Sequence, residues 1–89
     1  MEVSFGNSFE KIFRKRIKGT AYEVLFWETL DLFIKDPFDD RLRTHKLSGK
    51  LKSLWSFSVD YNLRVVFFFT KEKPTKAIFV DIGTHDEVY

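Results

Sequence analysis

The alternation of apolar and polar residues predicts a short strand and then a helix at the start of the chain. Residues 3–5 read apolar, polar, apolar, which suits a strand, and the Gly-Asn pair after them favours a turn. Asn7 with Glu10 three positions later resembles a capping box, and Gly19 is a stop signal. The apolar residues between these signals fall at helical spacing on one face: Phe9, Ile12, Phe13 and Ile17.

A second helix is predicted directly after the first. Thr20 with Glu23 repeats the start signal, and Pro37 disfavours helical geometry in Asp36 before it. An apolar stripe lies between these limits and consists of Tyr22, Leu25, Phe26, Leu30, Phe33 and Ile34. The two amphipathic helices should therefore form a hairpin.

A polar connection and then strand patterns follow the helices. Residues 38–54 are rich in polar and basic side chains, which indicates a loop. Residues 55–60 alternate large apolar with small polar side chains, so Ser56 and Ser58 are expected on a solvent-exposed face. Residues 63–69 are nearly all apolar, which is typical of a central strand that is covered on both faces.

A polar connection at residues 71–74 and a last strand over 77–82 complete the element order β-α-α-β-β-β. This order predicts the α+β class, with an N-terminal strand, a two-helix hairpin and an antiparallel meander in one four-stranded sheet. Two helices cover only one face of such a sheet. The other face is therefore expected to be open to a ligand or partner and to carry the function.

The composition fits a single domain over residues 1–89. A chain of this length encloses one hydrophobic core, and a 44% apolar content with eleven phenylalanines is enough to build it. The absence of cysteine excludes disulfides and indicates a reducing compartment. There is neither a basic leader with an apolar run nor a stretch of about 18 uncharged apolar residues. We therefore expect a cytoplasmic protein that does not enter the membrane.

A formal net charge of +2 conceals two basic blocks with acidic sequence between them. The first block consists of Lys11, Arg14, Lys15, Arg16 and Lys18. The second block lies in the predicted loop and consists of Arg41, Arg43, Lys46, Lys50 and Lys52. A phosphate backbone is the natural ligand for such patches. The first block also fits a solvated helix face, the more ordinary explanation, whereas the loop position of the second favours RNA binding.

Two histidines, His45 and His85, are the side chains best suited to proton transfer at neutral pH. Both are predicted in loops, and they would form an acid–base pair if the fold brings them together. Alternatively, each is an ordinary exposed loop residue. A metal site that combines them with Asp81 and Asp86 matches no known ligand spacing, so no metal is expected.

Arg64 and Tyr89 are the other candidates for a binding or catalytic role. Arg64 opens an otherwise apolar strand, so its guanidinium needs an oxyanion, a phosphate, or an intramolecular partner such as Asp60 or Asp81. Tyr89 can stack on a base or donate a proton, or it completes the core as a docked aromatic residue. The residues alone leave both choices open.

Four segments in a fixed order resemble one protein family. They are 45–51 (HKLSGKL), 54–57 (LWSF), 63–67 (LRVVF) and 82–89 (IGTHDEVY). Together with the helical hairpin before them they resemble the RelE/ParE toxin superfamily, and the Gly-Thr-His ending most resembles its YafQ branch. The resemblance covers nearly the whole chain. It implies a four-stranded, mainly antiparallel sheet with both N-terminal helices on one face and an active cleft on the other.

The resemblance also implies a function. Members of the RelE and YafQ branches are toxins of toxin–antitoxin pairs, and they act as mRNA interferases, endoribonucleases that cleave mRNA in the ribosomal A site. The 2′-hydroxyl attacks the adjacent phosphate, so no cofactor or metal is implied. The implied partners are mRNA on the ribosome, with rRNA contacts through basic residues, and a cognate antitoxin that forms a hetero-oligomer with the toxin.

Candidate roles follow from the same resemblance. His45 falls where YafQ-like members carry a histidine, a candidate general base for the 2′-hydroxyl. His85 is the histidine of the Gly-Thr-His segment, a candidate general acid for the departing 5′-oxygen. Arg64 matches an arginine that would stabilise charge on the phosphorane, and Tyr89 matches a terminal aromatic residue that contacts the substrate.

The chain departs from the family pattern on the expected open face. Ser56 and Ser58 stand where many members carry Lys or Arg on the outward face of the second predicted strand, and Asp81 stands where YafQ-like toxins carry an arginine. We expect Asp81 to orient His85 or to pair with Arg64. The alternative functions are a ParE-like gyrase inhibitor, which does not rely on acid–base residues, and a non-catalytic homologue that binds only antitoxin or RNA.

Overall fold

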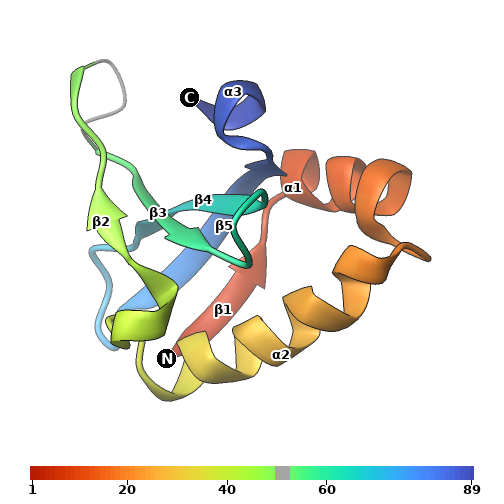
Figure 1. Cartoon of the computed structure of the whole chain (residues 1–89). Coiled ribbons are helices and arrows are strands. Elements are labelled where there is room, and N and C mark those ends of the chain that lie inside the picture. Colours follow the sequence, from red (N-terminus) through yellow and green to blue (C-terminus); the bar gives the residue numbers. More distant parts are fainter. Residues whose placement is uncertain (50–52) are drawn as a thin grey trace.

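The computed structural model describes residues 1–49 and 53–89 and contains a mixed sheet with helices on both faces (Figure 1). The strands are β1 (Glu2–Phe5), β2 (His45–Lys46), β3 (Trp55–Ser58), β4 (Arg64–Phe69) and β5 (Lys76–Gly83). The helices are α1 (Asn7–Ile12), the π-helix η1 (Phe13–Ile17), α2 (Ala21–Lys35), the 3-10 helix η2 (Asp40–Leu42) and α3 (His85–Val88).

The strands form one sheet in the order β1-β5-β4-β3-β2. β1 runs parallel to β5, and every other neighbouring pair is antiparallel. The predicted α+β class and the order of the four main strands are confirmed. The sheet has five strands and not four, because His45 and Lys46 in the predicted loop pair with Ser56 and Trp55.

The predicted helical hairpin is present, with one difference at its start. Asn7 makes no capping bond, because the chain already turns at Gly6, which is the N-cap. Thr20 caps α2 as predicted by accepting the backbone N–H of Tyr22, and α2 ends before Asp36. No helix in the described ranges is long and apolar enough to cross a membrane.

Phenylalanines from the sheet and the helices fill the core between them. Phe33 of α2 is fully buried, and its ring centroid lies 4.8 Å from that of Phe57, 5.1 Å from Phe67 and 5.3 Å from Phe79. Phe9 belongs to the same cluster. Because one ring of α2 contacts rings of three neighbouring strands, this packing fixes the helix on the sheet.

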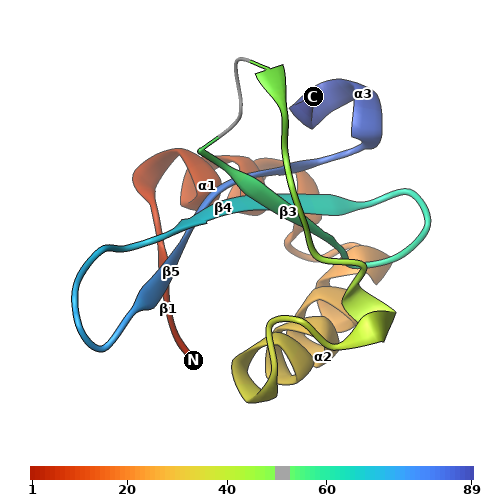
Figure 2. The same cartoon turned by 90° about the vertical axis from the view of Figure 1, so that its left-hand side faces the viewer.

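The opposite face of the sheet is covered in part by α3, which the sequence analysis did not predict. Both views place α2 and α3 on opposite sides of the sheet (Figures 1 and 2). Val66 of β4 and Val88 of α3 are buried, although neither belongs to the main core cluster. Ser56 is also fully buried, so the prediction that it faces solvent was wrong. The open face is therefore smaller than the strand pattern suggested.

Replacement of Phe33 with alanine tests the central role of this ring. Because Phe33→Ala removes a fully buried side chain, we expect the free energy of unfolding to fall by about 3–5 kcal/mol. Chemical denaturation monitored by circular dichroism measures this change. Val24→Ala on the same helix is the control, since Val24 is 62% exposed. Equal losses from the two variants would contradict the described packing.

Candidate active site

The strand register places polar side chains together on the open face. His45 lies directly opposite Ser56, and Arg64 lies directly opposite Ser58. Directly opposed residues share one face of a sheet, with Cβ atoms about 4.5–5.5 Å apart. Phe57, between the two serines, points into the core instead. His45, Ser56, Ser58 and Arg64 therefore belong to the same face.

Helix α3 brings Tyr89 and His85 to this face. The Tyr89 hydroxyl donates a hydrogen bond to Oγ of Ser56, and the His85 ring lies edge-on to the Tyr89 ring with centroids 4.5 Å apart. The helix starts with a capping box in which Thr84 and Glu87 bond each other's backbone N–H groups. Ser56 thus contacts Tyr89 directly and lies opposite His45, so it connects the two histidine positions.

The backbone of Arg43 sets the proton position on His45. Nδ1 of His45 lies 3.0 Å from the carbonyl oxygen of Arg43. A carbonyl only accepts, so Nδ1 carries the proton and neutral His45 keeps its free lone pair on Nε2. Arg43 has a φ of 53°, in the left-handed region that non-glycine residues seldom occupy. Such strain is concentrated at functional sites, and here it aims the carbonyl at the histidine.

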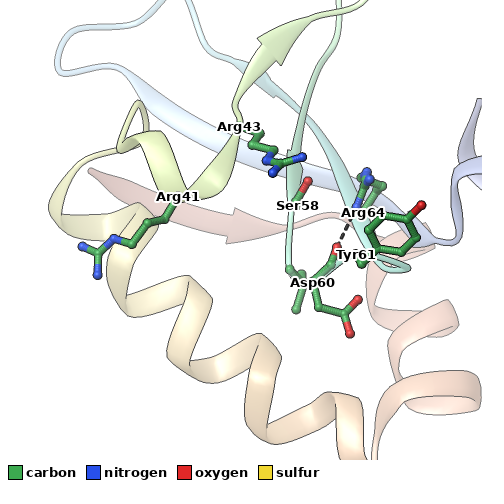
Figure 3. Close-up of a pocket in the computed structure, with 7 residues that line it drawn as sticks. Arg41, Arg43, Ser58, Asp60, Tyr61 and Arg64 are labelled. Atoms are coloured by element: carbon green, nitrogen blue, oxygen red, sulfur yellow. Dashed lines mark hydrogen bonds between the residues drawn. The ribbon is translucent and has the colours of Figure 1, made fainter.

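Two adjoining hollows on this face share Arg64 and Tyr61 as lining residues. One, of about 230 Å³, extends along β3 to Arg43, and the other, of about 370 Å³, extends to His85. Figure 3 shows Arg43 and Arg64 on either side of Ser58. The structure therefore brings Arg64 and His85 together in one hollow, with Tyr89 against the His85 ring.

Arg43 and Arg64 make this surface positive. Arg64 donates from Nη1 to the carbonyl oxygen of Asp60 at 2.6 Å, whereas the Asp60 carboxylate accepts the backbone N–H groups of Asn62 and Leu63. Within residues 1–49 and 53–89, neither arginine lies within 4.0 Å of a carboxylate. Two guanidinium groups without a carboxylate partner favour the binding of a phosphate.

The other predicted RNA-binding residues are placed less favourably. Arg41 forms a two-pronged ion pair with Asp39, and its guanidinium points away from Arg43 and Arg64 (Figure 3). These hydrogen bonds lower the pKa of Asp39 to about 2. Lys46 is exposed on β2 beside His45. Lys50 and Lys52 lie outside the described residues.

Asp81 does not take either of the expected positions. Its Oδ1 accepts the backbone N–H of Ile82, and it lines a hollow with Arg16 and Glu87 between η1 and α3. The carboxylate nearest to Nδ1 of His85 is that of Asp86, at 3.6 Å. Burial raises the pKa of Asp81, and the Glu87 charge adds to this effect. The expectation that Asp81 orients His85 or pairs with Arg64 was therefore wrong.

Sequence reasoning missed three features of the site. Tyr61, which is 88% exposed at the turn after β3, offers a flat aromatic surface at the rim of both hollows. Ser56 anchors Tyr89, and no local pattern reveals a contact between residues so far apart. Helix α3 did have a signal, because Thr84 and Glu87 have the spacing of a capping box.

Known proteins with this architecture were found by structural comparison alone. No protein-family model and no curated protein matches the chain. A copper-bound mutant of a toxin from Helicobacter pylori is 27% identical, with a TM-score of 0.72 over 100% of this chain and 99% of the other. YafQ from Escherichia coli has 17% identity and a TM-score of 0.73 over 99% and 97%. A YoeB/ParE toxin from Agrobacterium tumefaciens has 14% identity and a TM-score of 0.74 over 96% and 99%.

The chain has the RelE/ParE toxin fold. The predicted resemblance is thereby confirmed at the level of the fold, and the assignment to the YafQ branch stays a prediction. YafQ has also been crystallised in a complex with DinJ. Metal is bound in crystals of the Helicobacter toxin, but in the described part of this chain no three His, Asp or Glu residues come together to hold a metal ion.

The raised pKa of Asp81 predicts a pH-dependent gain in stability for Asp81→Asn. A carboxyl whose pKa is higher in the folded than in the unfolded state costs stability once it ionises, so the cost grows as pH rises above the ordinary value of 3.8. Asparagine keeps an oxygen for the N–H of Ile82 but carries no charge. We expect a higher melting temperature than wild type at pH 7 and no difference near pH 3, measured by calorimetry. A constant difference at both pH values would argue against the buried charge.

Proposed function

We propose that the protein is the toxin of a toxin–antitoxin pair and a metal-independent endoribonuclease that cleaves mRNA on the ribosome. The observation that supports this most is the placement of Arg64 and His85 in one hollow, on the face of the sheet where His45 lies opposite Ser56, the partner of Tyr89. Arg64 supplies positive charge in the hollow that His85 also lines. These are the groups that a phosphate-transfer reaction without metal needs: a base, an acid and a cation.

In the proposed reaction, Nε2 of His45 takes the proton of the ribose 2′-hydroxyl. The 2′-oxygen attacks the adjacent phosphorus, and the bond from phosphorus to the 5′-oxygen breaks. His85 gives a proton to that departing oxygen, and Arg64 stabilises the charge on the phosphorane. The products are a 2′,3′-cyclic phosphate and a 5′-hydroxyl. Tyr89 contacts the substrate beside His85 in this scheme.

The proposed partners follow from the toxin fold and the charge of the site. The proposal of a cognate antitoxin is supported by the complex of YafQ with DinJ, because YafQ has the same fold as this chain. An acidic antitoxin segment would complement the surface of Arg43 and Arg64. The proposed substrate is messenger RNA. The basic residues are proposed to contact rRNA. The proposed site of action is the cytoplasm, where translating ribosomes are found.

Replacement of either histidine tests the acid–base pair. His45→Ala and His85→Ala should each lower the cleavage rate about 10²- to 10⁴-fold, since proton transfer contributes that much in similar reactions. The assay is primer extension on a defined mRNA in a purified translation system. Circular dichroism verifies that the variants fold. Full activity in both variants would refute the pair, and no cleavage by the wild type beside an active reference toxin would favour gyrase inhibition or simple binding.

Arg64→Ala should lower the cleavage rate about 10²-fold, because charge on the phosphorane loses its nearest stabilising cation. Arg64→Lys should recover only part of this, since lysine lacks the planar fork of donors. Arg14→Ala removes the same charge from η1 and serves as the matched control. If Arg64→Ala loses stability but keeps the wild-type cleavage rate, Arg64 serves only to hold the turn through the Asp60 carbonyl.

A further inference from the structure

Helix α3 carries two of the proposed site residues but is too short to be stable alone. It spans His85–Val88, and isolated helices need about 12–15 residues to be even marginally stable in water. Its position must therefore come from contacts with the rest of the protein. On the sheet side these are the burial of Val88 and the hydrogen bond from Tyr89 to Ser56.

A third contact holds α3 from the opposite side. Nη1 of Arg16 donates to Oε2 of Glu87 at 2.5 Å, and this pair joins η1 to α3 across 71 positions of sequence. Oε1 of the same carboxylate accepts the backbone N–H of Thr84 at 2.8 Å. The hydrogen bonds from Thr84, with the Arg16 charge, lower the pKa of Glu87. One carboxylate therefore both starts the helix and ties it to η1.

The surrounding backbone leaves little freedom in where Glu87 lies. A Cβ atom at Gly83 would lie 3.0 Å from Oε1 of Glu87, 3.1 Å from its Cβ and 3.2 Å from Cγ1 of Val88. A larger residue at this position would push Glu87 and Val88 outward by a few tenths of an ångström, so glycine favours the close approach of α3 to the end of β5. Arg16 belongs to a π-helical turn, a rare conformation that is frequently found at functional sites. Both partners of the ion pair are thus held by unusual local structure.

We propose that Arg16 and Glu87 form a positioning pair that holds His85 and Tyr89 over the open face in the geometry for reaction. The inference rests on the proposed function. It gives one residue of the first basic block a role other than RNA binding or solvation. The pair contacts neither the reacting atoms nor the hollow that His85 lines, and it acts through the orientation of α3.

The expected effect is moderate because both side chains are about half exposed. Exposed ion pairs contribute little to stability, so we expect a loss of about two- to fivefold in the equilibrium constant for seating the helix, and a loss in kcat of up to that factor. KM should change little. Folding of the whole domain should be unaffected, since the core cluster contains neither residue.

The experiment compares Arg16→Gln and Glu87→Gln, singly and together, with two controls of equal charge change. Glutamine at position 87 keeps the capping box and removes only the charge. Arg14→Gln and Glu10→Gln change neighbouring exposed residues of η1 and α1. Cleavage of mRNA on programmed ribosomes gives kcat and KM. The nuclear Overhauser effect between the His85 and Tyr89 rings reports the seating of α3 without any reference to activity.

The two single variants change the net charge in opposite directions, which separates positioning from RNA attraction. Positioning predicts that both lower kcat by a similar factor, that the double variant is no worse than either, and that Arg16→Lys retains most of the rate. RNA attraction predicts a gain for Glu87→Gln and a loss for both Arg16→Gln and Arg14→Gln, which would overturn the proposal. If the wild type cleaves nothing, the proposed function fails. Independently of activity, an unchanged contact between the His85 and Tyr89 rings in both Arg16→Gln and Glu87→Gln would refute the positioning pair.

Discussion

The hydrogen bond between the Tyr89 hydroxyl and the buried Ser56 hydroxyl is the interaction on which the open face depends. A buried hydroxyl without a partner costs about 1–3 kcal/mol, so this contact is strongly favoured once Ser56 is buried. It fixes Tyr89, and through the ring contact it fixes His85. Ser56 also lies opposite His45, so the residue that holds Tyr89 belongs to the same part of the sheet as the first histidine.

The phenylalanine core makes this arrangement stable enough to be specific. Rings from α1, α2 and three strands fill one side of the sheet, so the strands cannot slide without loss of packing. The register of β3 then places Ser56 and Ser58 on the open face, and the register of β4 does the same for Arg64. The site thus consists of polar residues that the strand register keeps out of the phenylalanine core.

The sequence predicted features that rest on local pattern and missed those that rest on distant contacts. The stripe of α2 and the apolar run of β4 are local, and both elements were placed correctly. Leu25 and Ile34 of the predicted stripe are nevertheless exposed, so the buried face of α2 is narrower than predicted. The pairing of His45 with Ser56 spans a polar segment in which no periodicity reveals a two-residue strand. Asp81 lies opposite Val66 on the expected face, but it lines a hollow with Arg16 and Glu87. No local pattern shows which distant side chains a strand residue meets.

The parallel pairing of β1 with β5 has a consequence for the order in which the molecule assembles. Residues 2–5 are synthesised long before residues 76–79, with which they pair, and α3 follows after these. Long-range pairing of this kind is slow, because the intervening chain must close before the contact stabilises anything. A growing chain therefore exposes His45 without its counterpart His85. The complete face needs Tyr89, so a growing chain that has not yet reached this residue carries no assembled site inside the cell that makes it.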